Sequence, residues 1–416
     1  MKAVILAAGR SSRFKPLSDK RHKALTEVMG KSLIQHTIDE LRETDVDEVI
    51  VVQGPEREIE DSIVSADRFV VQEEPKGMGN ALLQAKELLE DRFLVLTPYR
   101  SNAADLFQPM IDKADEEDAD TVFVASETDQ PEKYGILDIE DGNIVDIVEK
   151  PSPEDAPSNM KAVGIYLLSK DFFEYLENVE TKEYQYEEAL SEQMKDSPAS
   201  FVKAEKDTNS IKYPWDMFDV MEEILEKSKR KISEDADIAD SAEIKGKVIV
   251  EEGAKIFENA VVKGPAYIGK NAVIGNNAVV RDGSCIERGA TVGANCEVKN
   301  SSFQPESTMH SQFIGDSIMG RNSRIGAGTV VANRNFRDEG ERPEIVSDLI
   351  SKDYVKQTGR NSLGCFIGDE VDIGVNCSIM PGVQIGSDAK IGPGTVVKEN
   401  VENGSTVFVN QEVKKR

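Results

Sequence analysis

Only three residues of the chain are histidines, the side chains that most readily exchange a proton near neutral pH. His22 lies in a polar loop and His36 on the face of a predicted helix, where packing or a surface position explains each of them. His310 differs, because it lies where a regular sequence repeat is interrupted. An imidazole placed there could accept the proton of an attacking nucleophile. A lone loop histidine usually has no chemical role, but the break in the repeat makes His310 a candidate for one.

A second group of candidate residues follows the first apolar run of the chain. That run, residues 2–8, leads into the loop Gly9-Arg10-Ser11-Ser12-Arg13, and Lys23 comes shortly afterwards. Small residues after a strand let backbone N–H groups approach phosphates. Arg13 and Lys23 would neutralise negative charge on those phosphates during transfer. Considered alone, such a loop is better explained as a plain tight turn.

The element that must position His310 is a six-residue repeat. Ile or Val occupies every sixth position from 232 to 298, and apolar residues resume the repeat at 313–331 and 367–397. Helices and half-buried strands do not have this period, whereas a short fixed repeat is typical of solenoids built from stacked coils. Three hexads would make one triangular coil, with the branched residue inside and a small residue near the corner. Cys296 and Cys377 occupy the small position, so we expect the four cysteines to be packing residues without metal-ligand spacing.

The first half of the chain alternates predicted strands and helices, which indicates a Rossmann-like, doubly wound α/β domain with a mostly parallel sheet. The charged run 226–231 predicts the boundary between this domain, 1–229, and the repeat domain, 230–416. We expect strands at 2–8, 49–52, 69–72, 93–96 and 121–125, a hairpin at 136–147, and helices at 31–43, 80–89, 184–194 and 217–229.

Composition limits the possible partners of the protein. The formal net charge is −27, which argues against binding nucleic acid or anionic membranes. Acidic residues occur throughout the chain, which favours adaptation to high salt, with an ordinary acidic protein as the alternative. No apolar run is long enough to span a bilayer. We interpret the N-terminal run as a strand rather than a signal peptide, and we expect a cytoplasmic protein.

The N-terminal motifs together resemble the signature of sugar-1-phosphate nucleotidylyltransferases. Further matches in register are Gln72-Glu73, Gly77-Met78-Gly79-Asn80-Ala81, Val148-Glu149-Lys150-Pro151, Ser158-Asn159, Gly164-Ile165-Tyr166 and Tyr213-Pro214-Trp215-Asp216. The resemblance implies catalytic roles for Arg13 and Lys23. It further implies nucleotide contacts from Leu6, Ala8, Gly9, Gln72 and Gly77, and sugar-phosphate contacts from Glu149, Lys150 and Asn159.

The same resemblance fails at the metal site. Members of this family hold Mg²⁺ with aspartates, which suits a hard cation. Thr97-Pro98-Tyr99 stands where the first aspartate is expected, and Ser210 stands at the second position. We therefore assign no metal ligand. Two alternatives remain: Asp105 or Asp207 supplies the metal through a shifted loop, or the domain binds nucleotide or sugar phosphate without turnover.

The repeat resembles the left-handed parallel β-helix of hexapeptide-repeat acyltransferases. The whole layout resembles archaeal bifunctional sugar-1-phosphate nucleotidylyltransferase/acetyltransferases, which implies acetyl-CoA as a co-substrate and a homotrimer. The segment 309–317 matches the one that supplies the general base, here His310. The resemblance also implies sugar-phosphate contacts from Arg281 and Lys299 and acetyl-CoA contacts from Gly328 and Asn333. Residues 334–360, which lack the repeat, are expected to form an extended loop.

Three functions are therefore considered for this chain. The first is acetyl transfer from acetyl-CoA to an amino-sugar 1-phosphate, with His310 as the base. The second is an active nucleotidylyltransferase, dependent on Mg²⁺, whose C-terminal half is a scaffold. The third is a non-catalytic subunit that senses a ligand or regulates a partner, as the loss of carboxylates at Tyr99 and Ser210 suggests.

Overall fold

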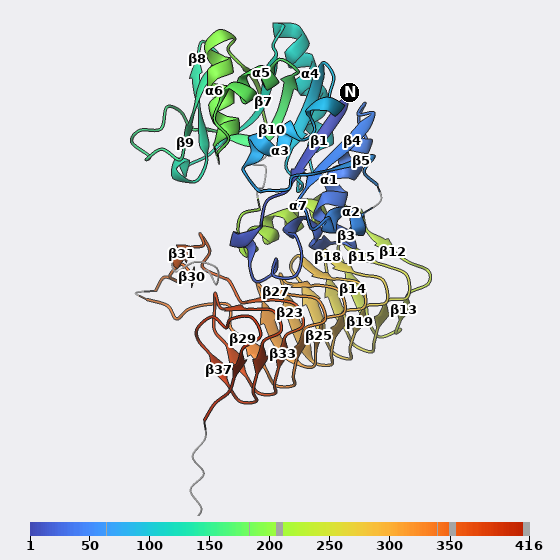
Figure 1. Ribbon diagram of the computed structural model, residues 1–416. Helices are drawn as coiled ribbons and strands as arrows, with labels where there is room; N and C mark the ends of the chain where they lie inside the picture. Colours follow the sequence, from blue (N-terminus) through green and yellow to red (C-terminus); the bar gives the residue numbers. More distant parts are fainter. Residues whose placement is uncertain (64, 183, 205–210, 339, 349–354, 411–416) are drawn as a thin grey trace, which may run out of the picture. The chain divides into compact units, whose positions relative to one another are not determined.

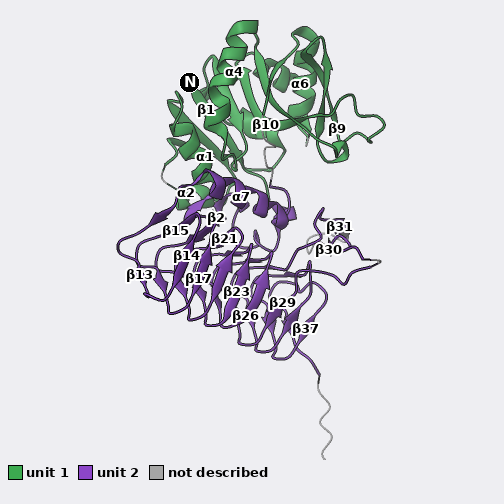
Figure 2. Cartoon of the chain, turned by 180° about the vertical axis from the view of Figure 1, so that it is seen from behind, with its two compact units in different colours: residues 1–10, 33–210 green, residues 11–32, 211–416 purple. Residues whose placement is uncertain are grey.

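The computed structural model describes residues 1–63, 65–182, 184–204, 211–338, 340–348 and 355–410. It divides into two compact units, one formed by residues 1–10 and 33–210 and the other by residues 11–32 and 211–416 (Figure 2). We call them the head and the tail. The domain boundary predicted at 229/230 stays a prediction, because compactness and independent folding are different properties. None of the described helices has the length and apolar character needed to cross a bilayer.

The head is built on a sheet with the strand order β11-β7-β10-β6-β1-β4-β5, to which β8 and β9 are attached (Figure 1). β1 is parallel to β4 and β6, and β10 is antiparallel to both of its neighbours. The sheet is mostly parallel, as predicted. Its strands are β1 (Lys2–Ala7), β4 (Glu48–Gln53), β5 (Arg68–Val71), β6 (Arg92–Leu96), β7 (Thr121–Glu127), β8 (Gly135–Glu140), β9 (Asn143–Glu149), β10 (Met160–Ser169) and β11 (Ser200–Lys203).

Helices cover both faces of this sheet, because the central strands are apolar on both sides. Val4 and Leu6 of β1 belong to a core that includes side chains of α3, α5 and α6, whereas Ala3 and Ile5 point to the other face. The predicted helix 80–89 was too long, since α3 ends early and a separate 3₁₀ turn follows. The head helices are α1 (Leu33–Arg42), α2 (Glu58–Ser62), α3 (Met78–Leu83), α4 (Ala103–Glu117), α5 (Phe172–Asn178) and α6 (Gln185–Asp196).

The tail is a left-handed parallel β-helix with three faces, each a parallel sheet of short strands. The first face holds β12 (Lys231–Ile232), β15 (Val248–Val250), β18 (Ala266–Ile268), β21 (Ser284–Ile286), β24 (Ser302–Phe303), β27 (Ile318–Met319), β32 (Phe366–Ile367) and β35 (Gln384–Ile385). The second holds β13 (Asp237–Ile238), β16 (Lys255–Ile256), β19 (Val273–Ile274), β22 (Thr291–Val292), β25 (Thr308–Met309), β28 (Arg324–Ile325), β33 (Asp372–Ile373), β36 (Lys390–Ile391) and β38 (Thr406–Val407). The third holds β14 (Glu243–Lys245), β17 (Val261–Lys263), β20 (Val279–Arg281), β23 (Cys296–Lys299), β26 (Gln312–Gly315), β29 (Val330–Val331), β34 (Ser378–Ile379) and β37 (Val396–Val397).

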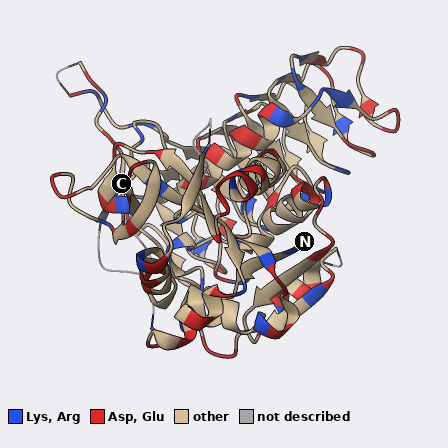
Figure 3. Cartoon of the chain, turned by 90° about the horizontal axis from the view of Figure 1, so that it is seen from above, with Lys and Arg blue, Asp and Glu red and all other residues tan. Residues whose placement is uncertain are grey.

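The six-residue repeat is confirmed by the pairing of these strands. Ile256 pairs with Ile274 and Val262 with Val280, so three hexads separate successive coils. These side chains are fully buried in one continuous core. All four cysteines are buried and free, which confirms their role as packing residues. Acidic residues are spread over the chain among Lys and Arg (Figure 3).

A segment from the N-terminal part of the sequence, residues 19–30, belongs to the tail and runs along one corner of the β-helix. We call it the strap; it includes β2 (Glu27–Val28), which pairs with β3 (Lys31–Ser32), and the same unit contains α7 (Met217–Lys227). Successive residues of the strap contact successive coils of the β-helix. The contacts are Lys20 with Asp388, Arg21 with Asp369, Glu27 with Arg321 and Gln304, and Met29 and Gly30 with Glu287.

The interruption at 334–360 was predicted to lack regular structure, and this prediction was wrong in part. β30 (Val346–Asp348) and β31 (Val355–Gln357) pair as an antiparallel hairpin. The hairpin is attached to a later coil, since the Ser347 hydroxyl donates to the Gly382 carbonyl at 2.7 Å. The neighbouring Ile345 is buried. The segment is therefore anchored on the β-helix of its own chain.

Candidate functional site

The third face of the tail aligns two cations that the sequence had singled out. Arg281 at the end of β20 pairs in register with Lys299 at the end of β23, and Lys299 pairs with Gly315 at the end of β26. Residues paired in this way point to the same side of a sheet, and neighbouring strands are about 4.8 Å apart. The repeat therefore fixes the two cations side by side at one edge of the face.

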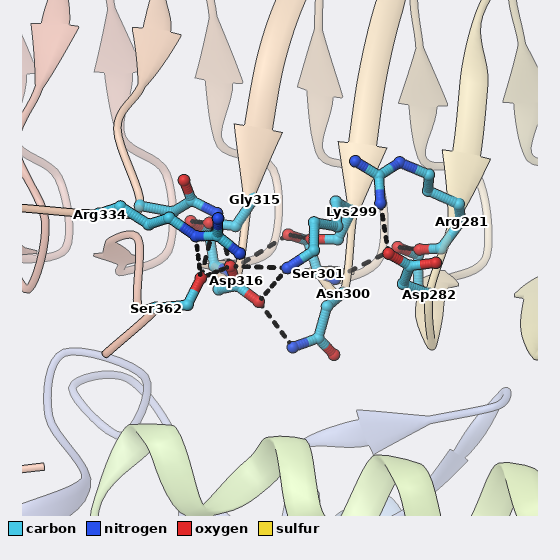
Figure 4. A network of polar contacts seen from close by, with 12 residues as sticks. Arg281, Asp282, Lys299, Asn300, Ser301, Gly315, Asp316, Arg334 and Ser362 are labelled. Atoms are coloured by element: carbon cyan, nitrogen blue, oxygen red, sulfur yellow. Dashed lines mark hydrogen bonds and ion pairs between the residues drawn. The ribbon is translucent and has the colours of Figure 1, made fainter. Parts of the chain in front are cut away.

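Asp316, which follows Gly315, holds this edge together (Figure 4). The side chain is almost completely buried, and its carboxylate forms an ion pair with the Lys299 ammonium at 3.2 Å. It also accepts hydrogen bonds from Asn300 at 2.9 Å and from Asn333 and Ser362 at 2.6 Å each. Sequence analysis missed Asp316 as a site residue. Its partners come from three separate segments, of which the one with Ser362 lies beyond the irregular interruption.

The electrostatics of Asp316 favour its charged form. Burial by itself raises the pKa of a carboxyl group, but hydrogen bonds from Ser362 and Asn300 and the charge of Lys299 outweigh it. The pKa of Asp316 is consequently lowered below its ordinary value. The ionised carboxylate fixes the ammonium of Lys299 and the amide of Asn333 in one orientation, which prepares them to receive a ligand.

A cavity of about 510 Å³ adjoins this network. Its walls combine the Asp316 cluster with the interruption, which contributes the guanidinium groups of Arg342 and Arg360. Arg281 lies one coil away and binds the Glu297 carboxylate through two nitrogens, at 3.0 and 2.7 Å. The polar cavity thus has Arg342 and Arg360 in its walls and Lys299 beside it, together with the carboxylates of Asp316 and Glu344; the cations suit a phosphorylated ligand. The lining residues are Asn300, Asp316, Arg342, Glu344, Gly359, Arg360, Asn361 and Ser362.

His310 lies at the other end of strand β26. It follows β25, is exposed, and makes no side-chain hydrogen bond or ion pair within the described part of the chain. The three steps from Gln312 to Gly315 span about 10 Å at the usual rise of a strand. The hydroxyl of the adjacent Ser311 accepts from the Gly328 N–H at 3.2 Å. The structure thus places Gly328 against Ser311, the neighbour of His310, and separately groups Lys299 and Asn333 around Asp316, with Arg281 one coil beyond Lys299.

In the head, the predicted nucleotide residues lie at strand ends and in the loops that follow. Leu6 is the second-last residue of β1, and Ala8 and Gly9 come directly after the strand. Gln72 follows β5 and is buried, and its amide donates to the Gly77 carbonyl at 3.1 Å. Gly77 has φ +98° and precedes α3, so its backbone conformation favours glycine. The structure brings Gln72 and Gly77 together.

The predicted sugar-phosphate residues of the head come from β9 and from the start of β10. Glu149 ends β9, and Lys150 follows it with φ +51°. The Lys150 ammonium lies 5.3 Å from the centre of the Tyr184 ring, a cation–π contact. Asn159 precedes β10, and its backbone carbonyl accepts from Thr128 at 2.9 Å. Glu149 and Lys150 are neighbours with their side-chain charges 3.7 Å apart.

Arg13 and Lys23 belong to the tail unit. Arg13 is exposed in a 3₁₀ turn, whereas the Lys23 ammonium donates to the backbone carbonyl of Ile211. His22 caps the turn that begins at Lys23, because its Nδ1 accepts from the Ala24 N–H at 3.2 Å. His22 therefore has a local structural role, as expected.

The expected metal position does not fit Mg²⁺. The loop after β6 contains Tyr99 and Arg100 where a carboxylate is needed. Neither a phenol nor a guanidinium is a ligand that a hard cation such as Mg²⁺ prefers. Asp105 lies on the exposed first turn of α4, and Asp207 and Ser210 fall outside the described residues. Within the described ranges, no three His, Cys, Asp or Glu side chains gather to hold a metal ion.

Comparison with known proteins decides the family. The model of the family described as "Nucleotidyl transferase" matches residues 2–216. The chain belongs to the nucleotidyl transferase family. In this nucleotidyl transferase, the model described as "Bacterial transferase hexapeptide (six repeats)" matches residues 247–282, 265–300 and 364–399 of the tail. The two models therefore cover both parts of the layout expected from the sequence.

Several curated relatives extend over the whole length of this nucleotidyl transferase. A protein named "Bifunctional protein GlmU" from Methanococcus maripaludis strain C5 is 33% identical over 427 residues, which cover 100% of both chains. A protein of the same name from strain C7 is 35% identical over 430 residues, again 100% of both. The "Bifunctional sugar-1-phosphate nucleotidylyltransferase/acetyltransferase" of Sulfurisphaera tokodaii is 32% identical and covers 92% of this chain and 93% of its own.

Proposed function

We propose that this protein transfers an acetyl group from acetyl-CoA to the amine of an amino-sugar 1-phosphate, using the β-helical tail. The observation that supports this proposal best is the cluster of Lys299 and Asn333 on the buried Asp316 carboxylate, beside a polar cavity. The relatives whose names include an acetyltransferase cover nearly the whole chain, which supports the same assignment. Nucleotide-sugar biosynthesis is the process in which such an enzyme would act.

Each residue has a role in the proposed reaction. Arg281 and Lys299 bind the sugar phosphate as charge-assisted hydrogen-bond donors. His310 accepts the proton of the sugar amine while the nitrogen attacks the thioester carbonyl. The carbonyl carbon forms its bond to nitrogen and loses the bond to sulfur, and CoA leaves as the thiol. In this proposal the Asn333 amide and the backbone near Gly328 contact acetyl-CoA.

The separation between His310 and the cation cluster gives the proposal a structural requirement. Strand β26 lies between the two groups within one chain, so the substrate has to reach from one end of the strand to the other. We propose a homotrimer in which a second copy completes the site, because parallel packing of three prisms would place different corners of neighbouring copies together. A cytoplasmic location and adaptation to high salt are further parts of this proposal.

An active nucleotidylyltransferase is the second candidate function. The family match over residues 2–216 and the names of the relatives favour it. The third candidate, a non-catalytic sensing or regulatory subunit, is favoured by Tyr99 and Arg100 at the expected metal position.

One set of assays distinguishes these functions. Purified protein in high salt is given acetyl-CoA with glucosamine 1-phosphate, and release of the CoA thiol is followed. We expect release in the wild type, its loss in His310→Ala, and normal release in His36→Ala, which removes an imidazole elsewhere. Thiol release that survives in His310→Ala would contradict the assigned base. Pyrophosphate release from UTP or dTTP with sugar 1-phosphate would instead establish the second function.

A further inference from the structure

The cavity beside the Asp316 cluster takes part of its wall from the interruption, residues 334–360. Arg342 and Arg360 both line the cavity, and both belong to the tail. Arg342 is half-buried, and its side chain makes no hydrogen bond or ion pair within the described ranges of the chain. A guanidinium carries five N–H donors and a permanent positive charge. Arg342 therefore offers both to a ligand in the cavity.

Arg360 is held in place by the turn that precedes it. Its backbone carbonyl accepts from the N–H of the buried Ile345 at 2.7 Å, and its N–H donates to the Thr358 hydroxyl at 3.2 Å. On the guanidinium, Nη2 donates to both carboxylate oxygens of Asp219 at 2.6 Å each. Both bonds come from the same nitrogen, so within the described part of the chain Nε and Nη1 keep their hydrogens for a ligand.

The charges of the two cations on the third face, in contrast, are already balanced by carboxylates. Arg281 binds Glu297 through two nitrogens and also forms an ion pair with Asp282. Lys299 lies 3.2 Å from both oxygens of Asp316. A phosphate ester brings a charge of about −1.5 to −2 at neutral pH. These two cations can donate hydrogen bonds to it, but the uncompensated positive charge has to come from another segment.

The carboxylates of the cavity wall leave that charge in place. Asp316 is neutralised by Lys299, as described above. Glu344 is exposed, so water and salt screen its charge, and it accepts from the Gly359 N–H at 2.5 Å. Gly359 has φ +73° and directly precedes Arg360, so the Glu344 contact helps to fix the turn that carries this arginine.

We propose that Arg342 and Arg360 bind the phosphate of the acceptor in this cavity and make the tail select a phosphorylated amino sugar over the free one. The proposal rests on the proposed acetyl transfer, whose acceptor carries a 1-phosphate. A guanidinium matches phosphate geometry through two parallel hydrogen bonds. The cavity adjoins Lys299, at the end of β26 that lies away from the predicted acetyl-CoA contact Gly328, so its ligand is the acceptor rather than CoA.

Calorimetric titration of the full chain tests the proposal. The probe is glucosamine 1-phosphate, and glucosamine is the same sugar without the phosphate. We expect the wild type to bind the phosphate ester more tightly than the free sugar. Arg342→Gln and Arg360→Gln should each weaken binding of glucosamine 1-phosphate about ten- to a hundredfold, the effect of losing one or two charge-assisted hydrogen bonds. Neither variant should change the Kd for glucosamine.

Three further measurements complete the design. Arg337→Gln removes the same charge from an exposed position of the same interruption, outside the cavity lining, and should leave every Kd unchanged. Arg342→Lys keeps the charge without the planar fork and should give an intermediate Kd. CoA also carries phosphates, and its Kd should be the same in the wild type and in Arg342→Gln.

Four results would overturn the proposal. They are an unchanged Kd for glucosamine 1-phosphate in both glutamine variants, an equal loss of glucosamine binding, a loss of CoA binding in place of acceptor binding, and no binding of glucosamine 1-phosphate to the wild type. Arg342 has no described side-chain contact to lose, so its variants should fold normally.

Release of the CoA thiol answers a separate question. A wild type that binds glucosamine 1-phosphate through Arg342 but releases no thiol would contradict the proposed acetyl transfer and support the phosphate site. Thiol release with the same KM for glucosamine 1-phosphate in Arg342→Gln would support acetyl transfer and contradict the phosphate site.

Discussion

Replacing Asp316 by asparagine is the sharpest test of the tail site, because the change preserves shape and removes charge. In the native protein one carboxylate oxygen accepts from Asn300, the other accepts from Asn333 and Ser362, and Lys299 contacts both. An asparagine has only one acceptor oxygen. Its amide nitrogen would face donors, and no carboxylate would balance the Lys299 charge.

The expected cost follows from these contacts. Hydrogen bonds to a charged group contribute about 1.5–3 kcal/mol each. Removing one member of a buried charge pair costs about 3–5 kcal/mol. We expect Asp316→Asn to lower the free energy of unfolding of the tail by about 3–5 kcal/mol. The matched control is Glu252→Gln, which breaks the exposed coil-to-coil pair with Lys270 and should cost at most about 1 kcal/mol.

The single tryptophan of the chain makes the measurement specific for the tail. Trp215 is buried, stacks on Tyr213 with ring centres 4.8 Å apart, and lies 6.0 Å from the Phe366 ring of β32. Urea unfolding followed by its fluorescence therefore reports the unit that contains Asp316. Because the pKa of Asp316 is lowered in the folded state, its contribution is present above the ordinary pKa of 3.8. It is lost only as the pH falls below that value.

Equal costs for Asp316→Asn and Glu252→Gln would refute the reasoning, since the carboxylate would then not be a buried organising group. So would a wild-type minus Asp316→Asn difference that grows rather than shrinks as the pH falls below 3.8. A second consequence concerns the proposed acetyl transfer. If Asp316 positions Lys299 and Asn333, the variant should raise KM for glucosamine 1-phosphate more than it lowers kcat.

Two further predictions concern the strap. Burial raises the pKa of Glu287 to about 8 from an ordinary 4.5, so the contribution of this carboxyl to stability is full below pH 4.5 and declines as the pH rises through 8. The difference in unfolding free energy between wild type and Glu287→Gln should decline over the same interval, and a flat difference would disprove the linkage. Gly30→Ala should destabilise the protein by more than Gly142→Ala, which we expect to cost about 1–2 kcal/mol. Both glycines have positive φ, but only at Gly30 would a new Cβ lie 2.5 Å from the Tyr267 hydroxyl, and equal melting temperatures would show that this contact relaxes freely.

Much of the fold follows from the sequence because the six-residue repeat is regular over most of the tail and the apolar runs of the head are clearly bounded. The six-residue repeat fixes which side chains point into the β-helix, and the register of Ile256 with Ile274 reproduces it. In the head, apolar runs between Gly and Pro locate the parallel strands. β10 was not predicted, because Lys161 and Gly164 interrupt its apolar pattern. The strand also bulges between Ala162 and Tyr166, where its pairing with β7 shifts register. The end of helix 80–89 depended on local backbone geometry that the helical pattern does not reveal.

The candidate site was predictable only where it lies on regular elements. Arg281 and Lys299 occupy equivalent positions in successive coils, so the repeat predicts that they are neighbours. Asp316 was missed because its importance depends on donors from other segments. Ser362 follows an interruption whose path no periodicity describes. The separation of His310 from this cluster was also beyond sequence reasoning, since a motif does not specify which corner of a coil each residue occupies.

The strap is marked in the sequence by polar residues on the coils that it contacts. Glu287 is fully buried although it lies just outside the prism, and a buried carboxyl group requires hydrogen-bond partners. Gln304 and Asp369 occupy similar places after their strands on the first face and are also buried. The coils satisfy only part of these side chains, since Asp369 accepts from the Arg321 N–H and Gln304 donates to Ser302, so further partners come from elsewhere in the chain. The strap supplies them: Glu287 accepts from two of its backbone N–H groups at 2.8 Å each, and Gln304 both donates to and accepts from the backbone of Glu27. Small or apolar residues would suffice at an uncovered corner of a hexad repeat. A row of polar residues at one corner therefore indicates that an extended segment docks there.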